Sequence, residues 1–91
     1  MRRVVITGLG ALTPIGNDVK TFKENLFKGV SGCDMITRFD ATYFPTRFAC
    51  ELKDFDVAEH MNHREARRLD PFTQYALIVA EQAMKESGID L

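Results

Sequence analysis

The apolar run at the start of the chain predicts a buried strand. Residues 3–7 read Arg-Val-Val-Ile-Thr, without the alternation of apolar and polar positions that marks a half-exposed strand. Continuous runs of this kind are typical of parallel sheets that are covered by helices on both faces. Glycines follow up to Gly16 and predict a tight turn at the end of the strand. Nothing downstream supplies an obvious parallel neighbour, so we expect these 91 residues to be the first part of a larger α/β protein.

The segment after this turn predicts an amphipathic helix. Asn17 or Asp18 can cap its first turn, and Gly29 provides a stop signal after Lys28. The apolar face that we expect follows helical spacing and consists of Val19, Phe22 and Leu26.

The last long element is predicted to be a helix that is buried on all sides. Asp70 is a suitable N-cap, Pro71 fits the first turn, and Gly88 ends the run. Apolar residues recur with helical spacing, and Leu77 and Ile78 fill the remaining angles. A helix that is apolar around its whole circumference lies among other elements. This chain has too few elements to surround it, which is a second sign that protein is missing.

The middle of the chain has weaker patterns. Residues 35–45 show no steady period and are expected to form an ordered, packed loop, whereas residues 46–52 alternate and predict a short strand at an edge or in a hairpin. Asp56 and Asn62 each precede a glutamate by three positions, an arrangement that predicts two short capped helices. We predict no repeat and no domain boundary within residues 1–91.

Composition and charge narrow the class of protein. Hydrophobic residues make up 45% and charged residues 27%, as in ordinary globular proteins. The net charge of −1 argues against nucleic-acid or membrane-surface binding, both of which favour an excess of Lys and Arg. No segment is long enough to span a membrane, and Pro14 and glycines interrupt the run after Arg2 and Arg3, so no signal peptide is predicted. We therefore expect a cytoplasmic protein.

The opening glycines do not form a nucleotide-binding motif. The dinucleotide fingerprint requires glycine at positions 8, 10 and 13, but position 13 is Thr. A phosphate loop would end in Gly-Lys-Ser/Thr, and Pro14 removes one of the backbone donors that a phosphate would need. We therefore expect no nucleotide cofactor.

The cysteines and histidines do not form a recognisable catalytic or metal site. Cys33 and Cys50 could pair, but a cytoplasmic protein keeps its thiols reduced. A zinc site needs closely spaced ligand pairs, which these cysteines together with His60 and His63 do not provide. We predict that the cysteines are small, partly buried packing residues and that the histidines are solvated. No catalytic or metal-binding residue is assigned.

Three arginines are the best candidates for a binding function. Arg64, Arg67 and Arg68 stand at i, i+3 and i+4, so a helix would place them on one side. Such a patch can bind phosphate or an acidic protein surface. The alternative is an ordinary solvated face. Candidate partners for its charges are Glu65 and the acidic segment before it, which consists of Glu51, Asp54, Asp56 and Glu59. Spacing alone favours this alternative.

The whole chain resembles the amino-terminal part of the β-ketoacyl-acyl carrier protein synthases, and most closely the class II elongating enzymes. The matches are collinear and spread over all 91 positions, which makes them more specific than any single motif. They comprise residues 3–17, 29–32, 36–40, 53–56, 64–70 and 74–76.

This resemblance implies a fold and a reaction. The fold would be thiolase-like, with two similar halves that each hold a mixed five-stranded sheet between helices, in a family of homodimers. Residues 3–7 would be the first strand of the first half. The reaction would be a decarboxylative condensation on an enzyme cysteine, assisted by two histidines. In the family these three residues lie beyond Leu91, so no catalytic residue is assigned here and the segment alone is expected to be inactive.

The resemblance also assigns a role to the arginines. In class II enzymes the positions of Arg64, Arg67 and Arg68 belong to a basic patch that meets the acidic acyl carrier protein, which reverses the interpretation from spacing alone. No cofactor is implied. Two alternatives stay open, a polyketide-type ketosynthase and a non-catalytic module that binds an acidic partner. One departure is Cys50, where relatives commonly have glycine.

Overall fold

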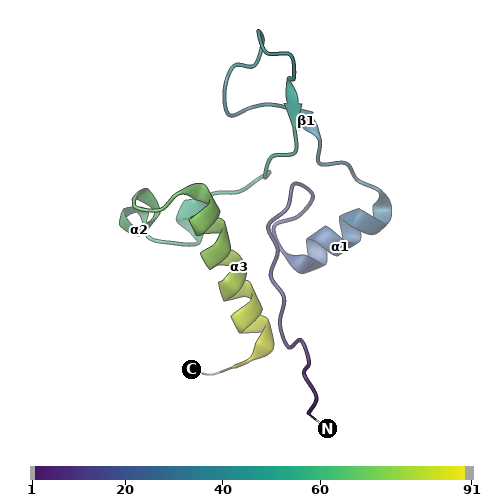
Figure 1. Cartoon of the computed structure of the whole chain (residues 1–91), viewed down its shortest axis with the longest axis vertical. Coiled ribbons are helices and arrows are strands. Elements are labelled where there is room, and N and C mark those ends of the chain that lie inside the picture. Colours follow the sequence, from purple (N-terminus) through teal and green to yellow (C-terminus); the bar gives the residue numbers. More distant parts are fainter. Residues whose placement is uncertain (1, 90–91) are drawn as a thin grey trace.

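The computed structural model describes residues 2–89, in which three helices and a small hairpin are arranged around an extended amino-terminal segment (Figure 1). The elements in chain order are α1 (Val19–Lys28), β1 (Asp34–Met35), β2 (Phe48–Ala49), the 3-10 helix η1 (Val57–Glu59), α2 (His63–Arg67) and α3 (Pro71–Ser87). None of the helices among residues 2–89 has both the length and the apolar character that a bilayer crossing requires.

The described residues bury little apolar surface. The buried hydrophobic residues among them are Ala41, Ala66 and Ile78. The radius of gyration is 16.2 Å, whereas a compact domain of this length would have about 12 Å. The elements within residues 2–89 are therefore spread out and do not share one core (Figure 1).

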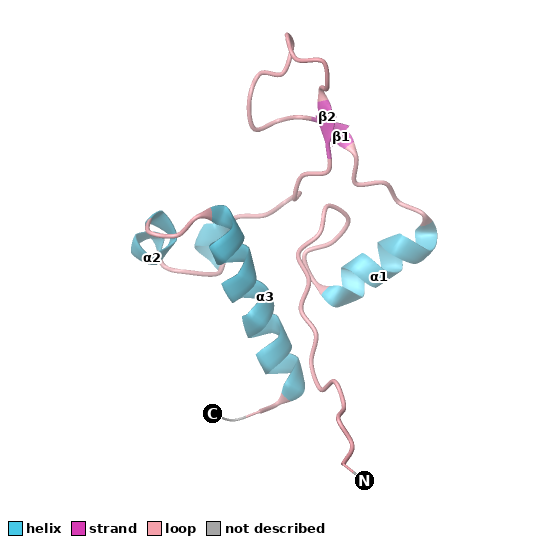
Figure 2. Ribbon diagram, viewed as in Figure 1, coloured by secondary structure: helices cyan, strands magenta, loops and turns pink. Residues whose placement is uncertain are grey.

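The predicted amino-terminal strand is wrong for this structure. Residues 2–12 are extended but belong to no strand (Figure 2). Val4, Val5 and Ile6 are 95%, 71% and 82% exposed instead of buried. The physical reason is that a strand exists only through hydrogen bonds to a neighbour, and no described segment pairs with these residues.

Gly8 and Gly10 provide space and do not form the predicted turn. A Cβ at Gly8 would lie 2.1 Å from the carbonyl oxygen of Ala83, and a Cβ at Gly10 would lie 2.1 Å from that of Val79. Both oxygens belong to the backbone of α3, so the opening segment passes directly along this helix. The tight turn comes later, where Thr13 and Gly16 exchange backbone hydrogen bonds of 2.8 and 3.2 Å.

The side chain of Gln82 fastens the opening segment to α3. The side-chain oxygen of Gln82 accepts from the backbone N–H of Ala11 at 2.9 Å. The amide nitrogen of the same residue donates to the carbonyl of Asn17 at 2.9 Å. Gln82 thus satisfies two backbone groups that lie outside any regular element.

The ends of α3 follow the prediction, but its burial does not. The helix begins at Pro71, and Gly88 ends it with φ 70°. Asp70 occupies the N-cap position as predicted, but its side chain makes no capping hydrogen bond. Ile78 is only 2% exposed, whereas Phe72 and Leu77 are 73% and 52% exposed. The prediction of burial on all sides is therefore wrong for this structure, because few described elements lie against the helix.

The predicted strand in residues 46–52 is confirmed as β2. It pairs antiparallel with β1, with Asp34 opposite Ala49 and Met35 opposite Phe48. Strand β1 was missed, because it is only two residues long and lies where residues 35–45 were expected to begin a loop. Between the strands, Phe39 and Phe44 meet edge to face with ring centroids 5.5 Å apart.

Helix α1 is capped as predicted at both ends. The Asp18 carboxylate accepts from the backbone N–H of Thr21 at 2.7 Å, and Gly29 adopts φ 73° at the other end. The hydrogen bond from the Thr21 backbone lowers the pKa of Asp18. The charged form of the carboxylate is therefore the one that stabilises the helix.

This cap predicts a pH-dependent loss of stability. We expect Asp18→Ala to lower the free energy of unfolding of the intact protein by about 1 kcal/mol at neutral pH. Because the folded-state pKa is lowered, this contribution is present above the ordinary carboxyl pKa and is lost as the pH falls through the folded value. Urea unfolding at neutral and acidic pH measures it. The control Asp18→Asn keeps an acceptor without the titration, and a deficit in Asp18→Ala that persisted unchanged in acid would contradict the prediction.

Candidate functional site

Helix α2 holds the three arginines on one side. It begins after Asn62, whose side-chain oxygen accepts from the backbone N–H of Arg64 at 2.7 Å, and it ends at the C-cap residue Arg68. Arg64, Arg67 and Arg68 are exposed, and together they line one open hollow of the surface. The common side that their spacing predicts is confirmed. We call this surface, formed by Arg64, Arg67 and Arg68, the arginine face.

The opposite side of α2 is anchored to α3. Ala66 is buried, with 7% of its surface exposed. The side-chain nitrogen of Gln74, in α3, donates to the carbonyls of Ala66 at 2.8 Å and Leu69 at 3.3 Å. The last carbonyls of a helix have no partner within it, so this amide fixes the end of α2 at which Arg67 and Arg68 stand.

The charges of the arginine face are uncompensated within the described residues. Between residues 2 and 89 the ion pairs are Arg38 with Glu51 at 3.9 Å and Lys85 with Glu81 at 3.1 Å. No pairing of the arginines with Glu65 or with the preceding acidic segment is present among residues 2–89, and three exposed, unpaired guanidinium groups agree equally with an ordinary solvated face. In that segment, Glu51 contacts Arg38 and Asp56 caps η1 through a 3.0 Å bond from Ala58.

The arrangement is suited to binding an anion and not to bond chemistry. Each guanidinium presents several N–H donors in a plane that matches a carboxylate or a phosphate. No nucleophile lines the same hollow. The arginine face thus has the chemistry to bind an acidic group.

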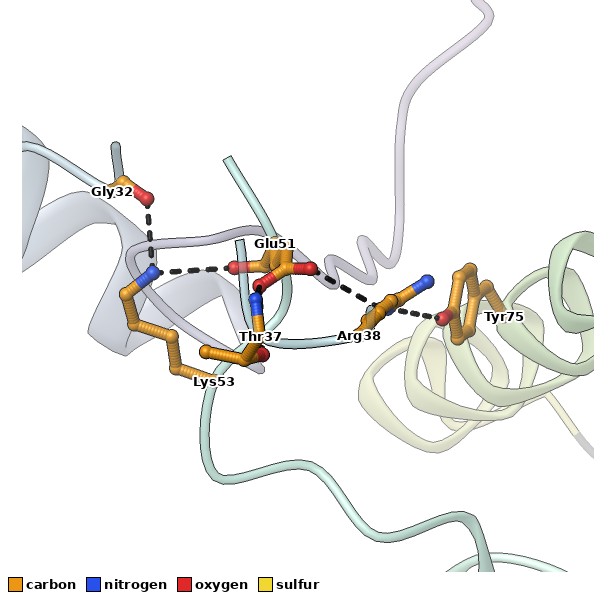
Figure 3. Close-up of polar contacts among 6 residues, drawn as sticks. All are labelled: Gly32, Thr37, Arg38, Glu51, Lys53 and Tyr75. Atoms are coloured by element: carbon orange, nitrogen blue, oxygen red, sulfur yellow. Dashed lines mark hydrogen bonds and ion pairs between the residues drawn. The ribbon is translucent and has the colours of Figure 1, made fainter. Parts of the chain in front are cut away.

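A polar network that the sequence pattern did not predict ties the hairpin to α3 (Figure 3). The Glu51 carboxylate accepts from the backbone N–H and the hydroxyl of Thr37 at 3.1 and 2.9 Å, and the hydroxyl bond is the main cause of its lowered pKa. Arg38 lies between this carboxylate and the Tyr75 hydroxyl, to which it donates at 3.1 Å. The only signal in the sequence was an acid within an alternating segment, which does not reveal its partners.

The cysteines and histidines form no catalytic set in the described part of the chain. His60 stacks on Phe55 with ring centroids 5.6 Å apart, and His63 is exposed in α2. Cys33 and Cys50 are both exposed and free, so the prediction that they are partly buried packing residues is wrong here. Residues 2–89 contain no group of three His, Cys, Asp or Glu side chains that could hold a metal ion.

Comparison with known proteins identifies the family. Residues 1–91 match the family described as "Beta-ketoacyl synthase, N-terminal domain", and the chain belongs to it. It is 53% identical over 90 residues to the 3-oxoacyl-[acyl-carrier-protein] synthase 2 of Staphylococcus aureus (strain COL), covering 99% of this chain and 22% of that protein. It is 47% identical over 90 residues to the protein of the same name from Vibrio harveyi, again covering 99% and 22%. The resemblance to class II enzymes is confirmed.

Solved structures of ketosynthases are also similar to this chain. The ishigamide ketosynthase/chain length factor superposes with a TM-score of 0.87 at 36% identity, covering 98% of this chain and 22% of that one. The structure of a type II polyketide acyl carrier protein in complex with its ketosynthase gives a TM-score of 0.71 at 34% identity, covering 94% and 22%. The fold is thus ketosynthase-like, and the chain spans about a fifth of the length of the proteins it matches.

Proposed function

We propose that the protein containing these residues is a 3-oxoacyl-[acyl-carrier-protein] synthase of fatty acid elongation. The observation that carries the proposal is the 53% identity to a protein of that name across 99% of the chain. An acyl group would pass from its carrier to an enzyme cysteine. Malonyl carrier protein would then lose carbon dioxide, and its carbanion would attack the acyl thioester and release the enzyme thiol.

Residues 2–89 would contribute scaffold and docking to this reaction and not its chemistry. The reaction needs a thiol of low pKa, an oxyanion hole and groups that stabilise an enolate. The described cysteines and histidines do not meet these needs. This agrees with the family, in which the catalytic cysteine and both histidines lie downstream of Leu91.

We further propose that residues 3–7 form a strand of a mixed five-stranded sheet in a thiolase-like half. This proposal is supported by the extended backbone of these residues and by their apolar side chains, which are largely exposed and so are available for packing. The exposed Phe72 and Leu77 of α3 would be covered by the same half. In this proposal residues 1–91 are the amino-terminal portion of the β-ketoacyl synthase domain, without an internal domain boundary. The whole protein would be a homodimer with a cytoplasmic location.

The arginine face would dock the acidic acyl carrier protein. Three exposed arginines that have no ion-pair partner between residues 2 and 89 lie on one anchored helix, and guanidinium groups are well suited to carboxylates. A structurally similar ketosynthase has been solved with its own acyl carrier protein.

A reconstituted reaction tests the proposed activity. The intact protein is incubated with acyl and malonyl carrier proteins, and the products are followed by mass spectrometry. We expect one 3-oxoacyl carrier protein and one carbon dioxide for each acyl group consumed. Binding of carrier protein without any product would contradict the proposal and favour a non-catalytic module.

The second candidate is a polyketide-type ketosynthase, which the two structural similarities favour. The same assay separates the two. A polyketide enzyme would add several malonyl units without intervening reduction, whereas an elongating enzyme stops after one until the 3-oxo group has been reduced.

A further inference from the structure

The two cysteines of the chain face each other across the hairpin. The register of β1 and β2 places Asp34 opposite Ala49 and Met35 opposite Phe48. Continued outward by one residue, the same register places Cys33 opposite Cys50. These are the two cysteines in the sequence.

The hydrogen-bond pattern makes this a closely spaced pair. The backbone N–H of Ile36 donates to the carbonyl of Arg47 at 2.9 Å, so these residues form a hydrogen-bonded pair. Hydrogen-bonded and non-hydrogen-bonded pairs alternate along an antiparallel ladder. Cys33 and Cys50 lie an odd number of positions away and therefore continue the ladder as a non-hydrogen-bonded pair. Such pairs have Cα atoms about 4.5 Å apart and side chains on the same face, and disulfides span Cα distances of about 4.4–6.8 Å.

The surroundings of the pair agree with this placement. Both thiols are exposed and free. Partial desolvation, followed by the nearby Cys50 thiol, raises the pKa of Cys33. The ammonium group of Lys53 donates to the carbonyl of Gly32 at 2.9 Å, which brings a positive charge beside Cys33. This charge acts against the rise in the pKa of Cys33 but is weaker than the causes of the rise, so Cys33 keeps its proton more readily than an ordinary thiol.

We propose that Cys33 and Cys50 form a reversible disulfide when the protein meets a small-molecule disulfide such as oxidised glutathione. The Cys50 thiolate attacks one sulfur of the oxidant, and the departing glutathione thiolate takes up a proton. Cys33 then loses its proton and attacks the Cys50 sulfur, which expels the second glutathione. Two protein thiols are oxidised and one glutathione disulfide is reduced to two thiols.

The bond would be conditional. A reducing cytoplasm keeps the pair as thiols, so the disulfide marks oxidising conditions and is not a permanent structural feature. When it forms, it closes the chain between residues 33 and 50 and fixes the open end of the hairpin. Glu51, which pairs with Arg38 at 3.9 Å, directly follows Cys50 in the chain.

Peptide mapping tests the pair directly. The intact protein is equilibrated in glutathione buffers of increasing oxidised fraction, quenched with an alkylating reagent and digested with trypsin. Cleavage after Lys28, Arg38, Arg47 and Lys53 places Cys33 in residues 29–38 and Cys50 in residues 48–53. We expect these two peptides to become cross-linked, with a mass lower by two hydrogen atoms than their sum. Alkylation of both should fall in parallel and return on reduction.

Single serine variants provide the matched controls. In Cys33→Ser, Cys50 has no resolving thiol, so we expect its mixed disulfide with glutathione to be at least several-fold more abundant than in the unaltered protein. Neither this variant nor Cys50→Ser should give a cross-link between residues 29–38 and 48–53. Independent modification of both cysteines in the unaltered protein, or thiols that stay alkylatable in fully oxidised glutathione, would overturn the proposal.

Discussion

We expect Gly10→Ala to detach the opening segment from α3 and to lower the free energy of unfolding of the intact protein by about 2–3 kcal/mol. The added Cβ would lie 2.1 Å from the carbonyl oxygen of Val79, at a contact between two backbones where no side chain can move aside. The neighbouring bond from Ala11 to Gln82 would be lost with the shift, which leaves polar groups without partners. Denaturant unfolding measures the stability, and amide exchange in residues 8–12 reports the detachment.

Gly29→Ala is the matched control, since it adds the same methyl group to a different kind of glycine. Nothing lies within 4 Å of a Cβ there, but the backbone has φ +73°. The expected cost is about 1 kcal/mol and comes from conformation alone. Fast exchange should then stay confined to the end of α1. If Gly10→Ala matched this control in both cost and exchange pattern, the close approach to α3 would not be the reason for glycine at position 10.

The helix ends could be predicted because their causes are local. Asp18 and Gly29 bracket α1, and Pro71 and Gly88 bracket α3, through contacts within a few residues of each end. The predicted capping boxes at Asp56 and Asn62 are confirmed only for the cap residue and not for the glutamate three positions later. Asp56 and Asn62 accept the expected kind of backbone hydrogen bond, but no hydrogen bond within residues 2–89 runs from the paired glutamates back to the caps.

The errors concern features that depend on distant partners. A strand at residues 3–7 needs a neighbouring strand, and β1 exists only because residues 48–49 pair with it. The role of Gly8 and Gly10 could not be predicted, because it depends on a helix about seventy positions away. The arginine face likewise has a local feature that could be predicted and distant contacts that could not. Spacing predicted its common side, whereas the Gln74 anchor and the missing ion pairs needed the structure.

We expect the double variant Arg67→Glu/Arg68→Glu of the intact protein to bind acyl carrier protein about tenfold more weakly at low ionic strength, equal to about 1.4 kcal/mol. Each exposed ion pair contributes up to about 1 kcal/mol, and charge reversal replaces two attractions by repulsions. The arginines have no intramolecular ion pair to lose between residues 2 and 89, so the fold should tolerate the change. Affinity measured across ionic strengths is the direct test. The affinity of the unaltered protein should fall as salt rises, because salt screens the attraction between the arginines and the carrier. The affinity of the variant should depend less on salt, because it lacks two of these attractions and salt also screens its new repulsions.

Kinetics and a charge-matched control separate docking from other effects. The arginine face contains no reacting group, so the double variant should raise the KM for the carrier-bound substrate and leave kcat with a small carrier-free thioester unchanged. Lys20→Glu/Lys23→Glu makes the same change in net charge on α1, where glutamate suits the first turns of a helix. An equal loss of affinity in this control would show that the overall charge of the protein attracts the carrier. Unchanged affinity of the arginine variant at low ionic strength would show that the carrier docks elsewhere.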